Sequence, residues 1–442
     1  MKTKWGLAAL VLVCATTSVW AAETPAEKPK PNPAEKLFKE GRDKLFMGDY
    51  AGAIVLLQRA AALDATKTST RLYLARAYRY AGKPDEARKL LEAILKTDAE
   101  HVEAGQLLAE LYAQEKQWKD VVRILEPLLR YRHDYTTYHL LAEAEYNLDQ
   151  PRKARKYFEE AVKQNPKSAN DHYQLGNIYL AGDFFALAAE RYASALTLGM
   201  ESPVLRYKLA SAYFNLRNYF GNISVVTVKA GKPGTISEGW YLIGPVPGRT
   251  DTFRAAPRKS AIYQVSKVIE SGVKDRPDIH FLRANIFLAA RRYAKAHAMF
   301  RDIEKTIPKA DKALFYYYYA EAAFGVGKYD AYLEHLDQAI ALDEKTYAAM
   351  RVDAYVKVAE QFNQAGKLKS YIEYLAKAVA QKPESAALHL KLGDAYEQAK
   401  DHTRAAAQWR MVLDLEPDHP KRMELMNLIQ DAQRRAAELA KG

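Results

Sequence analysis

Apolar residues recur along most of this chain with the spacing of one face of an α-helix. Within residues 169–197, for example, large and small apolar side chains fall at i, i+3, i+4 and i+7. Such stretches come in pairs separated by short polar turns, and several pairs end at a proline, which cannot continue a helix. The pattern therefore predicts consecutive helical hairpins from residue 34 to residue 419.

The first helix of each expected pair carries a small residue at a regular interval. These small residues are Gly41, Ala75, Ala109, Ala142, Gly176 and Ala210, and then Ala284, Ala320, Ala359 and Gly393. The first six are 33 or 34 residues apart, and a large apolar residue follows most of them in the second helix, such as Leu57, Phe158 or Trp409. Small residues let two helix backbones approach where the helices cross, so we expect a repeat of about 34 residues.

Two repeats carry a nearly complete fingerprint. It reads Leu392, Gly393, Tyr396, Ala405, Trp409 and Pro417 in the last repeat, and Leu175, Gly176, Tyr179, Ala188, Tyr192 and Ala195 in the one that begins at residue 169. This pattern resembles the tetratricopeptide repeat. The resemblance implies an all-α superhelical solenoid of about ten helix-turn-helix repeats. Tyr332 and Tyr371 stand where a small residue is usual, so we expect shifted helix geometry there.

The repeats suggest a division of the chain. Residues 34–202 hold repeats 1–5, residues 203–275 hold an interrupted repeat 6, and residues 277–419 hold repeats 7–10. The more highly charged segment 420–442 is expected to form the solvated capping helix that repeat arrays need for solubility.

The N-terminus has the pattern of an export signal. Residues 1–21 contain two early lysines, an unbroken apolar run and small residues near the end, which predicts a signal peptide cut near Ala21 or Ala22 and a periplasmic or secreted protein. An uncleaved membrane anchor is the alternative. The only cysteine, Cys14, lies in this leader, so a disulfide scaffold is excluded. The proline-rich segment 22–33 is expected to be a disordered tether.

Repeat 6 is interrupted by an insertion of different composition. The gap from Tyr213 to Ala261 exceeds the usual gap by 39 residues. Residues 223–228 and 235–244 are rich in β-branched and aromatic side chains and flank a turn, which predicts a β-hairpin within an insertion of about 220–258. We expect a basic contact patch there, formed by Lys229, Lys232, Trp240, Tyr241, Arg249, Arg254, Arg258 and Lys259. Packing against the array, or homo-oligomer formation through the insertion, is the alternative.

The family resemblance also suggests a groove. It implies that positions two, five, nine, twelve and thirteen of each repeat, on the first helices, line a concave face. Transferred to the middle repeats, these and neighbouring positions give His139, Tyr146, Asn147, Tyr173, Asn177, Tyr207, Ser211, Phe214, Asn215, Phe281, Asn285 and Tyr317. Positions five and nine are one helical turn apart, so an aromatic and a polar side chain would share a face. The alternative is that the fifth-position aromatics pack between neighbouring first helices.

Composition narrows the function. The net charge is +12, or +10 without the leader, which admits an anionic partner. No HExxH, GxSxG or GxGxxG motif and no metal-ligand cluster is present, so we expect a protein without catalytic activity, cofactor or metal. The expected partner is a protein or peptide of the cell envelope; a polysaccharide-binding or exopolysaccharide-export scaffold is the alternative. We expect no nucleic acid, and membrane contact only by proximity or through an uncleaved leader.

Overall fold

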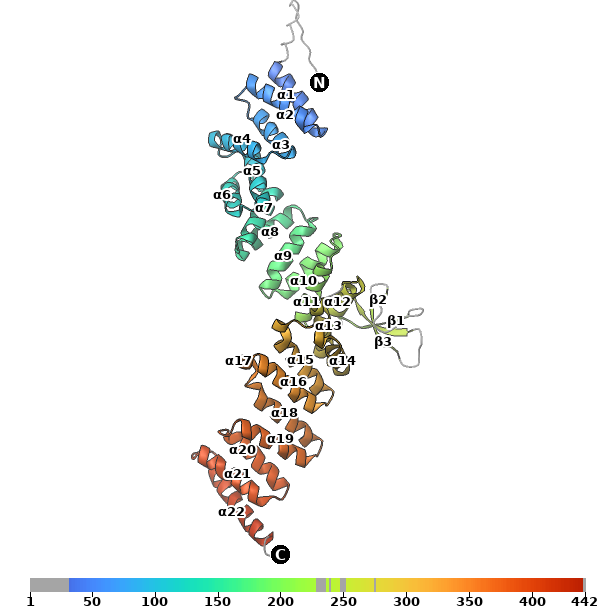
Figure 1. Cartoon of the computed structure of the whole chain (residues 1–442), viewed down its shortest axis with the longest axis vertical. Helices are drawn as coiled ribbons and strands as arrows, with labels where there is room; N and C mark the ends of the chain where they lie inside the picture. Colours follow the sequence, from blue (N-terminus) through green and yellow to red (C-terminus); the bar gives the residue numbers. More distant parts are fainter. Residues whose placement is uncertain (1–31, 228–235, 238–239, 247–251, 274–275, 440–442) are drawn as a thin grey trace, which may run out of the picture. The chain divides into compact units, whose positions relative to one another are not determined.

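The computed structural model describes residues 32–227, 236–237, 240–246, 252–273 and 276–439 (Figure 1). The expected signal peptide and nearly all of the expected tether lie outside these residues. The chain divides into two compact units, residues 1–164 and residues 165–442. In both units the described residues are mainly helical.

The first unit consists of four helical hairpins. Each odd-numbered helix packs on the helix that follows it. The helices are α1 (Pro33–Phe46), α2 (Tyr50–Leu63), α3 (Thr68–Tyr80), α4 (Pro84–Thr97), α5 (Val102–Gln114), α6 (Trp118–Leu128), α7 (Tyr135–Asn147) and α8 (Pro151–Gln164).

The second unit continues the hairpins and contains the insertion. Before the insertion lie α9 (Ala169–Ala181), α10 (Phe185–Thr197) and α11 (Pro203–Asn215). After it come α12 (Ala261–Glu270), α13 (Pro277–Ala289), α14 (Tyr293–Ile303), two 3-10 turns (Glu304–Thr306 and Lys309–Asp311), α15 (Lys312–Gly325), α16 (Tyr329–Leu342), α17 (Glu344–Tyr347), α18 (Met350–Gln364), α19 (Leu368–Gln381), α20 (Ala386–Gln398), α21 (His402–Leu415) and α22 (Arg422–Leu439). Within the described residues the two units thus hold ten helical hairpins, as the repeat predicted, followed by the last helix, α22, which packs on α21.

Local sequence explains where these helices begin. The α2 helix starts after Asp49, whose carboxylate accepts a hydrogen bond of 2.8 Å from the Gly52 N–H. The α9 helix starts after Ser168, whose hydroxyl accepts one from the Asp171 N–H. Such caps satisfy N–H groups that lack a partner in the first turn. Prolines occupy first helical positions in several other helices, Pro203 among them, where no N–H is required.

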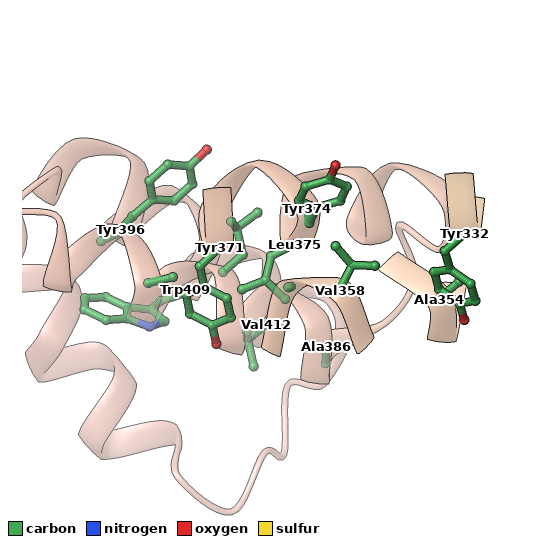
Figure 2. Close-up of a cluster of buried hydrophobic side chains, with 14 of the residues drawn as sticks. Tyr332, Ala354, Val358, Tyr371, Tyr374, Leu375, Ala386, Tyr396, Trp409 and Val412 are labelled. Atoms are coloured by element: carbon green, nitrogen blue, oxygen red, sulfur yellow. The ribbon is translucent and has the colours of Figure 1, made fainter. Parts of the chain in front are cut away.

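The core of the last repeats shows how the small and large positions fit together. Trp409, Leu375 and Val358 belong to one buried cluster that runs through several repeats (Figure 2). Tyr332 and Tyr371, the two departures from the usual small residue, lie in the same cluster and are only 4% and 7% exposed. The cluster thus accommodates both rings inside the core.

The insertion forms a four-stranded antiparallel sheet. Its strands β1 (Ser224–Thr227), β2 (Ile236–Ser237), β3 (Trp240–Pro245) and β4 (Thr252–Pro257) lie in the order β1-β4-β3-β2. Extended structure in the insertion is therefore confirmed, but the pairing predicted between residues 223–228 and 235–244 is wrong.

The strand β4 explains the error in pairing. It lies between β1 and β3, with Val226 opposite Phe253 and Leu242 opposite Ala255. Phe253 and Ala255 alternate with other residues, and together with Leu242 they form the small buried core of the sheet. In the sequence this alternation is short and is flanked by proline, glycine and arginine, so it gives only a weak signal for a strand.

Candidate functional site

The first unit carries a hollow of about 640 Å³ formed mainly by the first helices of its first three repeats. Side chains from α1, α3 and α5, with one from the start of α2, line it. They are Leu45, Phe46, Tyr50, Tyr73, Arg76, Arg79, Tyr80, Glu103, Gln106, Leu107 and Glu110. This volume is in the range of natural binding sites.

Four aromatic rings form much of this hollow, and two of them are largely exposed. Tyr50 and Tyr80 stack with ring centroids 5.5 Å apart, and Phe46 meets the edge of Tyr73 at 6.4 Å. Phe46 is 73% exposed and Tyr80 is 56% exposed. Large rings that remain in contact with water around a concave surface are typical of sites that bind a partner.

Of the two arginines in the hollow, one has a carboxylate partner within the described part of the chain and the other does not. Arg79 forms an ion pair with Glu110, and its guanidinium also lies 5.7 Å from the centre of the Tyr80 ring. Arg76 lies over Tyr73 at 5.2 Å but has no carboxylate partner among the described residues. The hollow thus contains one guanidinium that can still accept an anionic group.

The hollow has a fixed polar edge at α5. The Gln106 side-chain amide donates hydrogen bonds of 2.9 Å to the Asp134 carboxylate and 2.8 Å to the Thr137 hydroxyl. Asp134 in turn caps α7 by accepting from the Thr137 N–H. Gln106 is therefore held by the next repeat.

Most of the residues that line this hollow obey the position rule, that is, they occupy the groove positions that the family resemblance implies, although none of them is among the predicted groove residues. Arg76 and Glu110 are ninth positions, Tyr80 is a thirteenth position and Gln106 is a fifth position of their repeats. The rule was applied to the middle repeats, where aromatic and asparagine residues coincide. Applied to the first three repeats, it would have found this site.

The three residues predicted for the groove in the first unit do not line the hollow. His139 is half-buried, stacks on Tyr135 and lies 3.6 Å from Glu143. Tyr146 is 39% exposed, and the exposed Asn147 donates a hydrogen bond of 2.7 Å to the backbone oxygen of Glu143. These three residues are thus engaged in local contacts or exposed to solvent.

In the second unit, the side chain of Asn177 forms hydrogen bonds with neighbouring side chains. Its side-chain oxygen accepts hydrogen bonds of 2.7 Å from Lys208 and 2.9 Å from Tyr192, while its amide donates to Gln174. Lys208 also lies 5.2 Å from the centre of the Tyr173 ring. Tyr173 and Asn177 thus already have a contact with Lys208 of the neighbouring repeat, and their role in binding a ligand stays a prediction.

The same contact between neighbouring repeats, in which a lysine donates to a side-chain oxygen of the preceding repeat, recurs nearer the C-terminus. Lys357 donates to Glu321 at 2.9 Å, and Lys391 donates to Glu360 at 2.9 Å. In each case a ninth-position acceptor is bound by a sixth-position lysine of the next repeat. In these repeats the polar ninth position connects adjacent first helices.

The next predicted residues are partly occupied by local contacts. Tyr207 lies under Arg276 at 5.7 Å, and burial raises the pKa of the Tyr207 hydroxyl. Phe214 packs against Tyr219 with ring centroids 5.5 Å apart. Asn215 is exposed, but its amide donates to the backbone oxygen of Ser211, which is half-buried.

The predicted residues of repeats 7 and 8 are half-buried, in the case of Phe281 and Tyr317, or buried, in the case of Asn285. Phe281 packs on Phe300 and Phe315 with ring centroids 6.1 and 6.0 Å away. Tyr317 stacks on Tyr347 at 5.4 Å. Asn285 is only 8% exposed. The alternative, that fifth-position aromatics pack between neighbouring first helices, fits Phe281, which contacts Phe315 of α15. Tyr317 instead stacks on a residue of α17, and Asn285 is almost fully buried.

Only some of the described residues of the predicted basic patch lie together in the structure. Trp240, Arg258 and Lys259 line one hollow beside the sheet. Arg254 is exposed on β4 outside this hollow, and the fully buried Tyr241 accepts a hydrogen bond from Arg283. Tyr241 was thus wrongly placed in an exposed patch, since its position in β3 points it into the protein. Lys229, Lys232 and Arg249 lie outside the described residues.

The described residues contain no group of three or more histidine, cysteine or carboxylate side chains that could hold a metal ion. Among the helices of this part of the chain, none is both long and apolar enough to span a membrane.

Comparisons with known proteins identify the repeat. Models of the tetratricopeptide repeat match residues 47–98, 79–145, 136–178 and 364–420. Among solved structures, MamA from Desulfovibrio magneticus RS-1 is 21% identical, with a TM-score of 0.36, over 39% of this chain and 98% of that one. The pilF protein of Pseudomonas aeruginosa is 14% identical, with a TM-score of 0.37, over 43% and 93%. No curated protein matches the sequence significantly.

Proposed function

The chain belongs to the tetratricopeptide repeat family, and from this we propose that it is a non-enzymatic protein-binding scaffold of the bacterial cell envelope. Repeats of this kind present side chains from successive helices on one continuous surface. The partner is a protein or peptide segment that lies along the hollow of the first unit.

One observation carries this proposal: the hollow combines exposed rings with an unpaired guanidinium. Phe46 and Tyr80 offer apolar surface, and Arg76 offers a charge that no described carboxylate satisfies. Neighbouring helices are spaced by roughly 10 Å, so three first helices span about 20 Å. An extended peptide rises about 3.3 Å per residue, so about six residues of a partner would cross the hollow.

A pull-down after crosslinking in whole cells tests this function. We expect Arg76→Glu to reduce the recovery of the main partner, because the reversed charge repels an acidic group and leaves the rings of the hollow in place. The matched control is Arg59→Glu, which makes the same change at an exposed position of α2 outside the hollow. Equal recovery with both variants would show that the partner does not use the hollow.

The cell-envelope location is a separate part of the proposal. It rests on the charged start, apolar run and small residues of positions 1–21. N-terminal sequencing of the protein purified from its own cells should find a first residue near Ala22. A mature chain that begins at Met1 and fractionates with the cytoplasm would exclude export.

A second candidate function, in polysaccharide binding or exopolysaccharide export, is favoured by one feature of the other unit. Arg258 and Lys259 are exposed beside Trp240 in a hollow at the inserted sheet. Neither cation has a carboxylate partner among the residues that the structure describes.

A further inference from the structure

The inserted sheet joins the helical array next to a hollow of about 690 Å³. Asn218, Asn222, Ser224, Trp240, Arg258 and Lys259 contribute to its lining. We propose that this hollow binds an acidic polysaccharide, with Arg258 and Lys259 contacting sugar carboxylates and Trp240 contacting a sugar ring. This inference rests on the second candidate function and is independent of the hollow in the first unit.

The backbone that carries the two cations is fixed by the array. The Asn218 amide donates a hydrogen bond of 2.8 Å to the Lys259 carbonyl, and the Gln264 amide donates one of 2.7 Å to the Arg258 carbonyl. Gln264 is only 3% exposed and itself accepts from Arg206 at 2.9 Å. Because the backbone is already ordered, little conformational entropy is lost when a ligand binds there.

The two cations are electrostatically available. Both side chains are exposed, and neither forms an ion pair with any described carboxylate. Elsewhere in the second unit, Lys357, Arg276 and Arg206 each have a carboxylate within 3 Å. Two adjacent unpaired cations in a hollow produce a local positive potential that favours an anionic ligand.

The remaining lining suits a sugar. Trp240 lines the hollow and is half-buried, so part of this large aromatic residue remains accessible to a ligand. The side chains of Asn222 and Ser224 have no hydrogen-bond partner among the described residues, and both can donate as well as accept. Sugar hydroxyls also donate and accept, so these groups could pair with hydroxyls while the cations pair with carboxylates. An anionic membrane would also attract these cations. A polysaccharide chain can enter a concave site, however, whereas the flat surface of a bilayer cannot.

Calorimetric titration of the full-length protein with a short oligogalacturonate tests the proposal. We expect binding that weakens as salt is added, because exposed charges are screened. The double variant Arg258→Gln/Lys259→Gln should bind at least about tenfold more weakly, since hydrogen bonds to charged groups are each worth about a factor of ten. Trp240→Ala should also weaken binding, and circular dichroism should show that both variants remain folded.

A matched double variant separates this site from general positive charge. Arg291→Gln/Arg292→Gln removes two exposed cations from the turn after α13, outside this hollow, and should leave the affinity within about twofold. Equal losses in both double variants, or no binding by the wild type, would overturn the proposal. Tighter binding of a poly-glutamate peptide than of the oligogalacturonate would also overturn the proposal, because it would indicate an acidic protein partner.

A neutral maltooligosaccharide should not bind. Partner recovery through the first-unit hollow should be unchanged in all these variants, so the two proposals can fail separately.

Discussion

Where the two helices of a repeat cross, glycine faces the largest side chains of the core. A Cβ atom on Gly176 would lie 2.7 Å from the Tyr192 ring, and one on Gly393 would lie 2.7 Å from the Trp409 ring. In the repeats where the facing residue is leucine, such as Leu91 or Leu125, the same position is mostly alanine. At Gly176 and Gly393, the facing ring therefore leaves no room for a side chain on the first helix.

This pairing predicts a non-additive effect. Gly393→Ala should destabilise the protein by about 1–3 kcal/mol, because the added methyl overpacks the contact with Trp409. In a Trp409→Leu background the same substitution should cost much less, since the clash is gone. Urea unfolding of the four proteins measures the coupling. An equal cost in both backgrounds would show that the contact does not limit helix approach.

A second residue-scale feature is sensitive to pH. Tyr319 contacts two histidines, His297 with ring centroids 5.2 Å apart and His335 with stacked rings 3.9 Å apart. Burial, with a smaller contribution from Lys328, lowers the pKa of His297. The neutral ring is therefore favoured in the folded state. Its contribution to stability is complete above the unfolded pKa of about 6.5 and is lost as pH falls through the folded pKa.

Substitution of this histidine should reduce the pH dependence of stability. We expect His297→Phe to keep an aromatic ring against Tyr319 while removing the titrating group, so that melting temperature falls less on acidification from about pH 7.5 to about pH 5. The control His133→Phe changes an exposed histidine and should leave the dependence as in the wild type. An unchanged slope in His297→Phe would contradict the assignment.

At the scale of elements, hydrogen bonds and ion pairs from lysine side chains connect adjacent first helices. Lys357 pairs with Glu321 and lies 4.1 Å from the centre of the Phe324 ring. The pair also lies near Tyr332, whose pKa is strongly raised by burial. The lysine therefore joins α15, α16 and α18 through one ion pair and two aromatic contacts.

Removal of these lysine contacts should be measurable. Lys357→Met keeps the length of the side chain but not its charge, and should lower the free energy of unfolding by about 1 kcal/mol. The control Lys421→Met affects a pair with Glu424 in which both side chains are 59% exposed, and should change stability little. Thermal melts at low and high salt would compare them. If both variants behave alike, the contacts of Lys357 contribute no more than a surface ion pair.

The elements also differ in how well the sequence predicts them. The helical hairpins could be predicted, because the small and large positions recur at the same spacing in most repeats. The sheet occurs once, so nothing in the chain repeats its pattern. The pairing of β1 with β4 depends on contacts between segments about 30 residues apart, and β4 carries only the short alternation of Phe253 and Ala255.

At the scale of the whole molecule, the hollow of the first unit is lined by residues of the kind that the position rule describes, but it lies in other repeats than the predicted groove residues. The position rule correctly describes Arg76, Gln106 and Glu110, which line the hollow. It cannot tell whether a groove position is free, because that depends on the neighbouring repeat. Asn177 has the right position and chemistry, yet Lys208 already binds it. Periodicity therefore indicates which residues face the groove but not which of them remain available.

The central claim is that a protein segment binds along the hollow of the first unit. Site-specific photo-crosslinking in living cells tests it most directly, with the photoreactive residue placed at Tyr80 in the hollow or at Arg59 on α2 outside it. We predict one discrete protein crosslinked from position 80, absent from position 59, and lost when Arg76→Glu is added. No crosslinked protein at position 80, or the same products from both positions, would contradict the account.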